Sequence, residues 1–248
     1  MAKVAIFGAT SAIAAAAARA FVARGDDLAL IGRDAQKLAA VALDLKVRGR
    51  AEQTIATFQA DLDARERHAE WLAAAQAALG GLDIVLIAQG TLPDQKACEA
   101  DLDRMRAAFE TNALSVISLA ALSANLFERE RRGAIVVIGS VAGDRGRQSN
   151  YVYGSAKGMV AIFCQGLRNR LAPAGVSVTL VKPGFVDTPM TAGFEKKGLL
   201  WADAATVGRI VARAAARGAD VVYAPGFWFF IMAVIKAIPE RVFKRLKL

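Results

Sequence analysis

Residues that bind metals or form disulfide frameworks are scarce in this sequence. Its 248 residues include one histidine, His68, and two cysteines, Cys98 and Cys164, which lie far apart in the chain. Structural zinc sites need four such ligands, usually in closely spaced pairs. We therefore expect no metal site, two reduced cysteines that fill space, and a histidine on a helix surface.

Long hydrophobic runs are also absent. Hydrophobic residues make up 55% of the chain and its mean hydropathy is +0.33, but no apolar run reaches the roughly 18 residues that cross a bilayer. The first apolar run ends at Gly8, which makes it too short for a secretory signal. These absences argue against a transmembrane protein and predict a cytoplasmic one.

Basic residues outnumber acidic ones, and the formal net charge is +9. Nearly half of this charge follows residue 235, where the acid Glu240 stands among several basic residues. The segment continues the aromatic run 226–235, and an apolar body with a cationic end is typical of an element on a membrane surface. Elsewhere no basic patch is interleaved with aromatics, which argues against nucleic acid as a partner. The basic residues are Lys236, Arg241, Lys244, Arg245 and Lys247.

Apolar runs alternate with amphipathic stretches along the chain. Runs buried on both faces and joined by helices predict an α/β fold with a doubly wound parallel sheet, a Rossmann fold. No linker or repeat interrupts the pattern, so we expect one domain over 1–248, with a C-terminal apolar and basic segment over 225–248. The predicted strands are 4–8, 28–32, 83–88, 134–139, 176–181 and 220–224, and the predicted helices are 11–24, 34–48, 63–79 and 105–131.

The first strand-to-helix turn, "GATSAIA", is where such folds hold the phosphates of a dinucleotide. The usual pattern has glycines at positions 8, 12 and 14, but only Gly8 is present, and Ala12 and Ala14 each add a methyl group. Thr10, Ser11 and the start of the helix still offer donors to an anion. By itself this turn fits a purely structural role as well as a phosphate site.

The second predicted strand ends in "IGRD". An NAD site usually has an acid here for the ribose 2′-hydroxyl, but this chain has Gly32 and then Arg33, which suits the 2′-phosphate of NADP. A solvated arginine at the start of a helix is the alternative. Asp61, after the third strand region, either accepts from the adenine amino group or caps the next helix.

Tyr153 is followed four residues later by Lys157, so the two side chains share one face of the predicted helix. A tyrosine titrates near ~10, and a cation close to the phenol lowers its pKa by about 1 to 3 units, toward a useful acid/base range. Tyr151 has Ser155 at the equivalent position and lacks this partner. The spacing predicts that Tyr153 is a general acid, although such a pair also arises by chance.

Several further residues place the pair in a known context. Ser140 ends the fifth strand, Asn112 lies in "FETNALSV", Gly90 in "IAQG", and "KPGFVDTPM" covers residues 182–190. With these motifs, essentially the whole chain resembles the short-chain dehydrogenase/reductase family, although the asparagines of the family's "NNAG" motif are missing here. With these further matches, chance becomes a minor explanation for the spacing of Tyr153 and Lys157.

The resemblance implies an NADP-dependent carbonyl reductase that forms homo-oligomers. In that family Tyr153 would protonate the substrate carbonyl, Ser140 would hydrogen-bond it, Lys157 would also hold the ribose, and Asn112 would place a water in the proton relay. The residues implied for NADP(H) are Gly8, Thr10, Ser11, Ala12, Ile13, Arg33, Asp61, Leu62, Ala88, Gly90, Tyr153, Lys157, Pro183, Gly184, Val186 and Thr188.

The end of the chain narrows the resemblance further. Residues 221–248 and "GDRGRQSNYVYGSAK" are similar to the decaprenylphosphoryl keto-pentose reductases, which implies a lipid-linked keto sugar, contact of 226–248 with the inner face of a membrane, and a partner oxidase. Packing of the aromatic run on the body or at a subunit interface is the alternative. Arg145 and Arg147 either meet a substrate phosphate or lie in a solvated loop.

Two other functions stay open. An ordinary soluble ketone or 3-oxoacyl reductase would use the same catalytic residues, because one fold serves many carbonyl substrates. A non-catalytic NADP-binding regulator would fit the altered glycine turn, although such proteins usually lose the tyrosine or the lysine.

Overall fold

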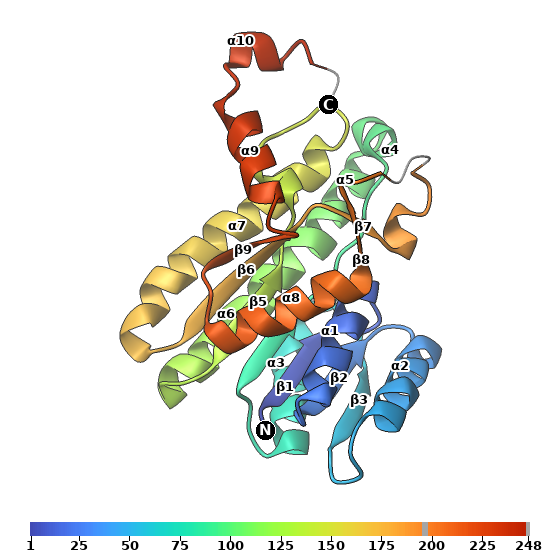
Figure 1. Cartoon of the computed structure of the whole chain (residues 1–248), viewed down its shortest axis with the longest axis vertical. Coiled ribbons are helices and arrows are strands. Elements are labelled where there is room, and N and C mark those ends of the chain that lie inside the picture. The colour runs from blue at the N-terminus through green and yellow to red at the C-terminus, as the bar shows by residue number, and fades with distance from the viewer. Residues whose placement is uncertain (195–197, 247–248) are drawn as a thin grey trace.

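A computed structural model describes residues 1–194 and 198–246. Within them, seven parallel strands form one sheet in the order β3-β2-β1-β4-β5-β6-β9 (Figure 1). The predicted doubly wound parallel sheet is confirmed, and each predicted strand and helix is present within a few residues. The strands are β1 (Lys3–Phe7), β2 (Asp27–Gly32), β3 (Ile55–Gln59), β4 (Ile84–Ile87), β5 (Ala134–Ile138), β6 (Ser177–Pro183) and β9 (Val221–Ala224).

The interior strand β1 explains why the sheet is apolar on both faces. It pairs in parallel with β2 and with β4, so that Val4 lies opposite Leu28 on one side and Ile84 on the other. Ala5 and Phe7 face a core formed with one set of helices, whereas Val4 and Ile6 face a second core with another set. Successive side chains of a strand point to opposite faces, so a strand covered on both sides needs a continuous apolar run.

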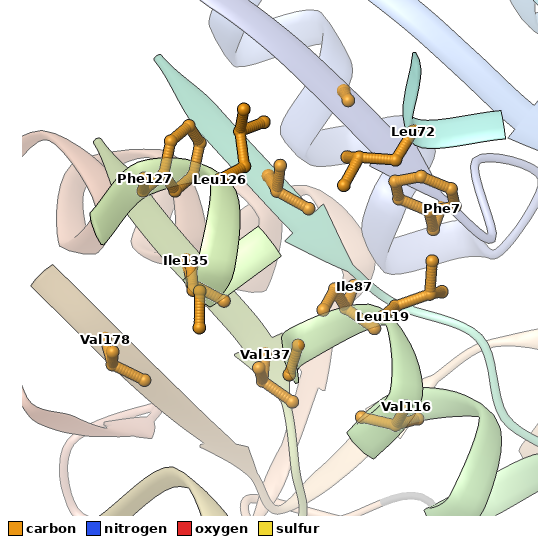
Figure 2. Packing of buried hydrophobic residues seen from close by; sticks show 14 of the residues in the cluster. Phe7, Leu72, Ile87, Val116, Leu119, Leu126, Phe127, Ile135, Val137 and Val178 are labelled. Carbon is orange, nitrogen blue, oxygen red and sulfur yellow. The ribbon is translucent and has the colours of Figure 1, made fainter. Parts of the chain in front are cut away.

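Helices cover both faces of the sheet. On one face Phe7, Ile87 and Val137 pack against Val116 and Leu119 (Figure 2). Both cysteines are buried and free, as predicted. The helices of that face are α3 (His68–Leu79), α6 (Ser115–Glu130) and α7 (Tyr151–Leu171), and those of the other are α1 (Ala12–Ala23), α2 (Ala35–Arg48) and α8 (Ala204–Arg217).

The predicted helix over 105–131 is longer than expected and irregular. Helix α5 (Leu102–Phe109) runs through a π-helical turn, η2 (Glu110–Leu114), into α6. The stretch Leu102–Glu130 is long and apolar enough to cross a membrane, but half of its most apolar window is buried inside the protein. Its buried side packs on the sheet, α3 and α7, which is the setting of a core helix.

His68 corrects the expectation of a surface histidine. Its ring is fully buried, with one nitrogen 3.0 Å from Ser118 Oγ and the other 2.9 Å from the carbonyl oxygen of Leu62. Burial lowers the pKa of His68. The histidine opens α3 and joins it to α6, a role that no helical periodicity could reveal.

The aromatic C-terminal run forms a helix, α9 (Trp228–Ala237), followed by the short α10 (Glu240–Phe243). Both lie at the end of the molecule far from the N-terminus (Figure 1). Arg145 fastens them, because its Nη1 donates to the carbonyl oxygens of Ile235 and Ile238 at 2.6 Å and its guanidinium lies 3.7 Å from the centre of the Phe243 ring. The solvated-loop alternative for Arg145 is therefore wrong, and so is a substrate contact. Lys247 lies outside the described residues.

Candidate active site

A cavity of about 600 Å³ lies where the strands end at their carboxyl termini, the edge at which ligands bind in such sheets. It brings together residues that are far apart in the sequence. Asn112 is the exception among the predicted residues: it is fully buried beside the cavity and does not line it. The predicted residues that line it are Gly8, Thr10, Ser11, Ala12, Ile13, Arg33, Asp61, Leu62, Ala88, Gly90, Ser140, Tyr153, Lys157, Pro183, Gly184, Val186 and Thr188.

The turn at Gly8 is held against the end of β4. Gly8 has a φ of +78°, and a Cβ there would lie 2.5 Å from the backbone nitrogen of Gln89, so only glycine fits. Ser11 caps α1 by accepting a hydrogen bond from the Ala14 amide at 3.2 Å. The amides that open α1 have no intrahelical acceptor and border the cavity. Ala12 lines the cavity, whereas Ala14 is fully buried in the core.

The end of β2 presents cations to the cavity. Arg33 is exposed there, and Lys37, one helical turn further on, lines the same end. The intervening carboxylate, Asp34, caps α2 by accepting from the Lys37 amide at 3.0 Å, and this hydrogen bond lowers the pKa of Asp34. Lys37 is absent from the predicted set, although its spacing of four from Arg33 was a usable signal.

Asp61 lies at the same end of the cavity. Its Oδ1 accepts from the Asp63 amide at 3.3 Å, and the helical turn that follows has no side-chain cap. The capping alternative for Asp61 is therefore wrong. Its carboxylate remains exposed at the wall of the cavity.

Ser140 and Tyr153 meet in the middle of the cavity. Ser140 directly follows β5 and accepts a hydrogen bond from the Ala142 amide at 3.1 Å, and Tyr153 lies in the first turn of α7. Burial raises the pKa of the Tyr153 phenol, and its hydrogen bond with Ser140 acts in the opposite direction without cancelling the rise. The expected lowering of this pKa by lysine is wrong, because desolvation is the largest effect on the phenol and raises its pKa.

Lys157 lies one turn after Tyr153, with its Nζ 5.8 Å from the centre of the tyrosine ring. The side chain is only 3% exposed, and burial lowers the pKa of Lys157 to about 8. Its ammonium donates to the carbonyl oxygen of Ile138 at 3.2 Å. That is its one hydrogen bond among the described residues, and an ammonium has three donors. The free donors at the cavity wall fit the hydroxyls of a ribose.

Asn112 lies in the π-helical turn η2, an irregularity that often marks a functional position. Its Oδ1 accepts from the Thr91 amide at 2.9 Å, and its Nδ2 donates to the carbonyl oxygen of Ala108 at 3.0 Å. A Cβ on Gly90 would lie 3.0 Å from Asn112 Oδ1 and 3.5 Å from Lys157 Nζ. Glycine at this position therefore keeps a narrow space open between the two side chains.

Gln89 is a cavity residue that the sequence reasoning missed. Its Nε2 donates to Ser115 Oγ at 3.3 Å, while its Oε1 is buried without a hydrogen-bond partner among the described residues. An unpaired buried oxygen at a cavity wall indicates that a bound ligand donates a hydrogen bond to it. The available signal was a polar residue directly after a buried strand, in the place of the family's "NNAG".

Aromatic side chains close the end of the cavity beyond Ser140. Trp228, from α9, is buried and packs so tightly on Gly184 that a Cβ there would lie 1.9 Å from the indole. Phe185 stacks on Trp201 with 5.2 Å between ring centres and meets Trp228 edge-on at 5.3 Å. One side of α9 thus packs on the body, as the packing alternative predicted, and forms part of the cavity wall.

Comparisons with known proteins agree with this geometry. The sequence pattern described as "short chain dehydrogenase" matches residues 2–198. The chain belongs to this family. An uncharacterized oxidoreductase of Streptomyces coelicolor is 33% identical over 170 residues, which cover 68% of this chain and 66% of that protein. The chain therefore matches slightly less than two thirds of the length of this curated relative.

Similar solved structures confirm the fold. A 3-oxoacyl-[acyl-carrier protein] reductase from Brucella melitensis, in complex with NAD, is 26% identical with a TM-score of 0.78, covering 91% of this chain and 96% of that one. An actinorhodin polyketide ketoreductase with NADPH is 22% identical with a TM-score of 0.79, covering 90% and 95%. Since one neighbour holds NAD and the other NADPH, the choice of coenzyme depends on residues of this chain.

Proposed function

We propose that this protein is an NADPH-dependent carbonyl reductase. The observation that carries the proposal is the hydrogen-bonded pair of Ser140 and Tyr153, placed in one cavity with the buried ammonium of Lys157. These groups lie between the dinucleotide end, at Gly8, and the aromatic end, at Trp228. That arrangement allows one ligand to lie against each side of the pair.

The side chains of this cavity can supply the proton that the reduction of a carbonyl group requires. A bound nicotinamide coenzyme supplies the hydride. The Ser140 hydroxyl donates a hydrogen bond to the substrate carbonyl oxygen, and Tyr153 transfers its phenolic proton to that oxygen. The raised pKa of Tyr153 keeps the phenol protonated at neutral pH, which is the form that a reduction requires.

Lys157 then stabilises the phenolate that Tyr153 becomes. Its ammonium is nearby, weakly paired and of lowered pKa, so it can also pass a proton toward the phenolate. The space between Lys157 and Asn112 is the place for a water that returns this proton. The same ammonium would hold the ribose hydroxyls of the coenzyme.

The preference for NADPH rests on the end of β2. Gly32 offers no carboxylate to a ribose 2′-hydroxyl, Arg33 and Lys37 face the cavity, and Asp34 is occupied in capping α2. Arg33 has no ion-pair partner among the described residues, and Lys37 has only the exposed Asp34, at 3.4 Å. This surplus of positive charge favours a 2′-phosphate. We place the adenine end near Asp61 and Leu62 and the nicotinamide near Pro183, Gly184, Val186 and Thr188.

Coenzyme titration tests the proposal. Fluorescence transfer from tryptophan should show NADPH binding tighter than NADH in the wild type, and the double substitution Arg33→Gln and Lys37→Gln should weaken NADPH by about 10- to 100-fold while leaving NADH nearly unchanged. Lys46→Gln, on the exposed side of α2, is the control. Equal affinities for both coenzymes in the wild type would contradict the preference.

A reductase assay tests the catalytic pair. Tyr153→Phe should still bind NADPH and lose at least about 100-fold in the rate of ketone reduction. If wild type and Tyr153→Phe both bind NADPH and neither oxidises it with any ketone, the alternative of a non-catalytic NADP-binding regulator replaces the enzyme.

For the substrate we propose a lipid-linked keto sugar of the polyprenylphosphoryl type. The outer side of α9 supports this, because Phe230 is 70% exposed and Val234 66% exposed beside the basic residues of the C-terminal segment. This apolar and cationic surface fits the inner face of a membrane, where a polyprenyl chain would lie. An oxidase would form the keto group, and that enzyme is the partner we propose.

Vesicle binding tests the membrane part. The double substitution Phe229→Ser and Phe230→Ser should abolish cosedimentation with vesicles of anionic phospholipid and leave ketone reduction unchanged. The control is Ile162→Ser, an exposed apolar residue of α7. Wild-type protein that does not sediment with vesicles would contradict membrane contact, and α9 would then pack at the interface of the homo-oligomer that we expect.

A 3-oxoacyl reductase is the second candidate. The aromatic end of the cavity also suits an acyl chain, and the Brucella melitensis reductase shares 26% identity with this chain. Turnover of a 3-oxoacyl thioester with a KM below that of a polyprenylphosphoryl keto sugar would select this candidate.

A further inference from the structure

Arg147 is a cation in the cavity wall with no evident structural task. It lies in the loop between the turn after β5 and α7, and it is partly buried at the cavity wall. Its Nε is buried and has no hydrogen-bond partner among the described residues. Burial lowers the pKa of Arg147, and the charge of Asp144 offsets this effect only in part. A buried N–H donor without a partner is costly unless a ligand accepts from it.

The acid that acts on Arg147, Asp144, has two other partners. Asp144 forms an ion pair with Lys182 and accepts from the Tyr223 hydroxyl at 2.6 Å, and its side chain is 3% exposed. Its carboxylate is thus shared by two other partners. Arg145 is equally committed, since it fastens α9 and α10.

Charge is unevenly distributed along the cavity. The acids among the described lining residues are Asp34, Asp61 and Asp63, and all of them follow β2 or β3 at the coenzyme end. The described lining residues after β4, β5 and β6 include no acid but two cations, Arg147 and Lys157. Besides the catalytic Lys157, the described lining of the substrate end therefore carries one cation, Arg147, and no acid, which suits the anionic oxygens of a phosphate ester.

Two further polar atoms at this end lack partners. The indole Nε1 of Trp228 is a buried donor, and Asn150 Oδ1 is a buried acceptor, and neither has a hydrogen bond among the described residues. Both residues line the cavity with Arg147. Donors from Arg147 and Trp228 suit anionic oxygens, and the asparagine oxygen suits a hydroxyl of the same ligand.

We propose that Arg147 and the Trp228 indole form a subsite for a phosphate group carried by the carbonyl substrate, with Asn150 accepting from a substrate hydroxyl. The inference rests on the proposed function, because it assigns the aromatic end of the cavity to the substrate of Tyr153. The chemical class is a hydroxylated keto compound with a phosphate ester. A free ketone without a charged group leaves the subsite unfilled.

A matched pair of ketones tests the subsite. Dihydroxyacetone phosphate and dihydroxyacetone differ only in the phosphate, and NADPH oxidation gives KM and kcat for each. Wild type should have a lower KM for the phosphate ester. Arg147→Gln should raise that KM about 10- to 100-fold and leave the KM for dihydroxyacetone and the affinity for NADPH within about twofold. Arg147→Lys should recover part of the loss.

Arg106→Gln is the control, since Arg106 is an exposed residue of α5 that pairs with Asp103. All titrations are made at constant ionic strength, because salt screens such contacts. Equal KM values for the two ketones in the wild type, or an equal rise of both in Arg147→Gln, would overturn the subsite while the reductase proposal stands.

A binding measurement separates the two proposals. Tryptophan fluorescence follows inorganic phosphate in the absence of any ketone, and Trp228 places a reporter at the subsite. If neither ketone is reduced, the proposed reaction fails for such substrates and this titration alone decides the subsite. Phosphate binding that weakens at least about tenfold in Arg147→Gln supports it, whereas absent or unchanged binding overturns it.

Discussion

Lys157 carries a charge that folding buries, and Lys157→Met removes the charge while keeping a similar volume. The folded protein lowers the pKa of Lys157 from 10.5 to about 8, because its ammonium is desolvated. That difference corresponds to on the order of 3 kcal/mol of lost stability whenever both folded and unfolded chains are protonated. We therefore expect Lys157→Met to raise the free energy of unfolding at pH 7, by about 1 to 3 kcal/mol, and to abolish reductase activity.

The sign of the pH dependence follows from the same pKa values. Below pH 8 both states hold the proton and the destabilisation is complete. As pH rises from 8 toward 10.5, the folded state loses its proton first and the penalty disappears. Between pH 7 and pH 9.5 the wild type should recover about 2 kcal/mol relative to Lys157→Met. The variant has no such recovery.

Urea unfolding at several pH values, followed by circular dichroism, measures this difference. Subtracting the two proteins removes the contributions of other groups, among them Cys164, whose burial raises its pKa to about 12. Lys46→Met, on the exposed side of α2, is the control and should leave the pH dependence unchanged. A Lys157→Met protein that is less stable than wild type at pH 7, with the same pH dependence, would refute the reasoning, because the ammonium would then be well solvated or paired.

Three further predictions follow from the structure. Arg145→Gln should release α9 and α10, because it removes hydrogen bonds to Ile235 and Ile238 and the contact with Phe243. Since charged hydrogen bonds contribute about 1.5 to 3 kcal/mol, limited proteolysis should cleave this segment faster, while the midpoint of global unfolding changes little. Equal cleavage rates in the two proteins would contradict this prediction. Gly184→Ala should displace Trp228, since the new Cβ would lie 1.9 Å from the indole. The substitution should lower the free energy of unfolding by about 1 to 3 kcal/mol and shift the tryptophan emission. Gly193→Ala, whose Cβ would meet nothing within 4 Å, is the control. Stability should fall as pH decreases through about 6.5, because the unfolded chain then binds a proton that buried His68 resists; urea unfolding of His68→Gln should show a smaller fall, and an identical fall would exclude His68 as the cause.

The sequence was sufficient for the sheet and for most of the candidate site. Apolar runs such as 4–8 and 134–139 can be buried on both faces only in a covered parallel sheet, and their ends meet at one edge. Because the order of strands brings those ends together, residues named one by one from Gly8 to Thr188 line a single cavity. The spacing of four between Tyr153 and Lys157 is a local property of a helix and needed no tertiary information.

The sequence was insufficient wherever burial or a distant partner decides the chemistry. Desolvation is the largest effect on the pKa of Tyr153, so this pKa rises although local spacing predicted a fall. His68 is buried because α6 covers it. Gln89 and Lys37 are cavity residues that no pattern had assigned.

The two arginines before α7 show most clearly which properties the sequence determines and which depend on tertiary packing. In the sequence Arg145 and Arg147 are equivalent, two basic residues in one loop. In the structure Arg145 binds the carbonyls that end α9, while Arg147 lines the cavity and its buried Nε has no partner among the described residues. The chain by itself determined the elements and the order of chemical groups, since these depend on neighbours in sequence. Tertiary packing decided which charges are neutralised, buried or left for a ligand, because only packing sets the partners and the solvent around each group.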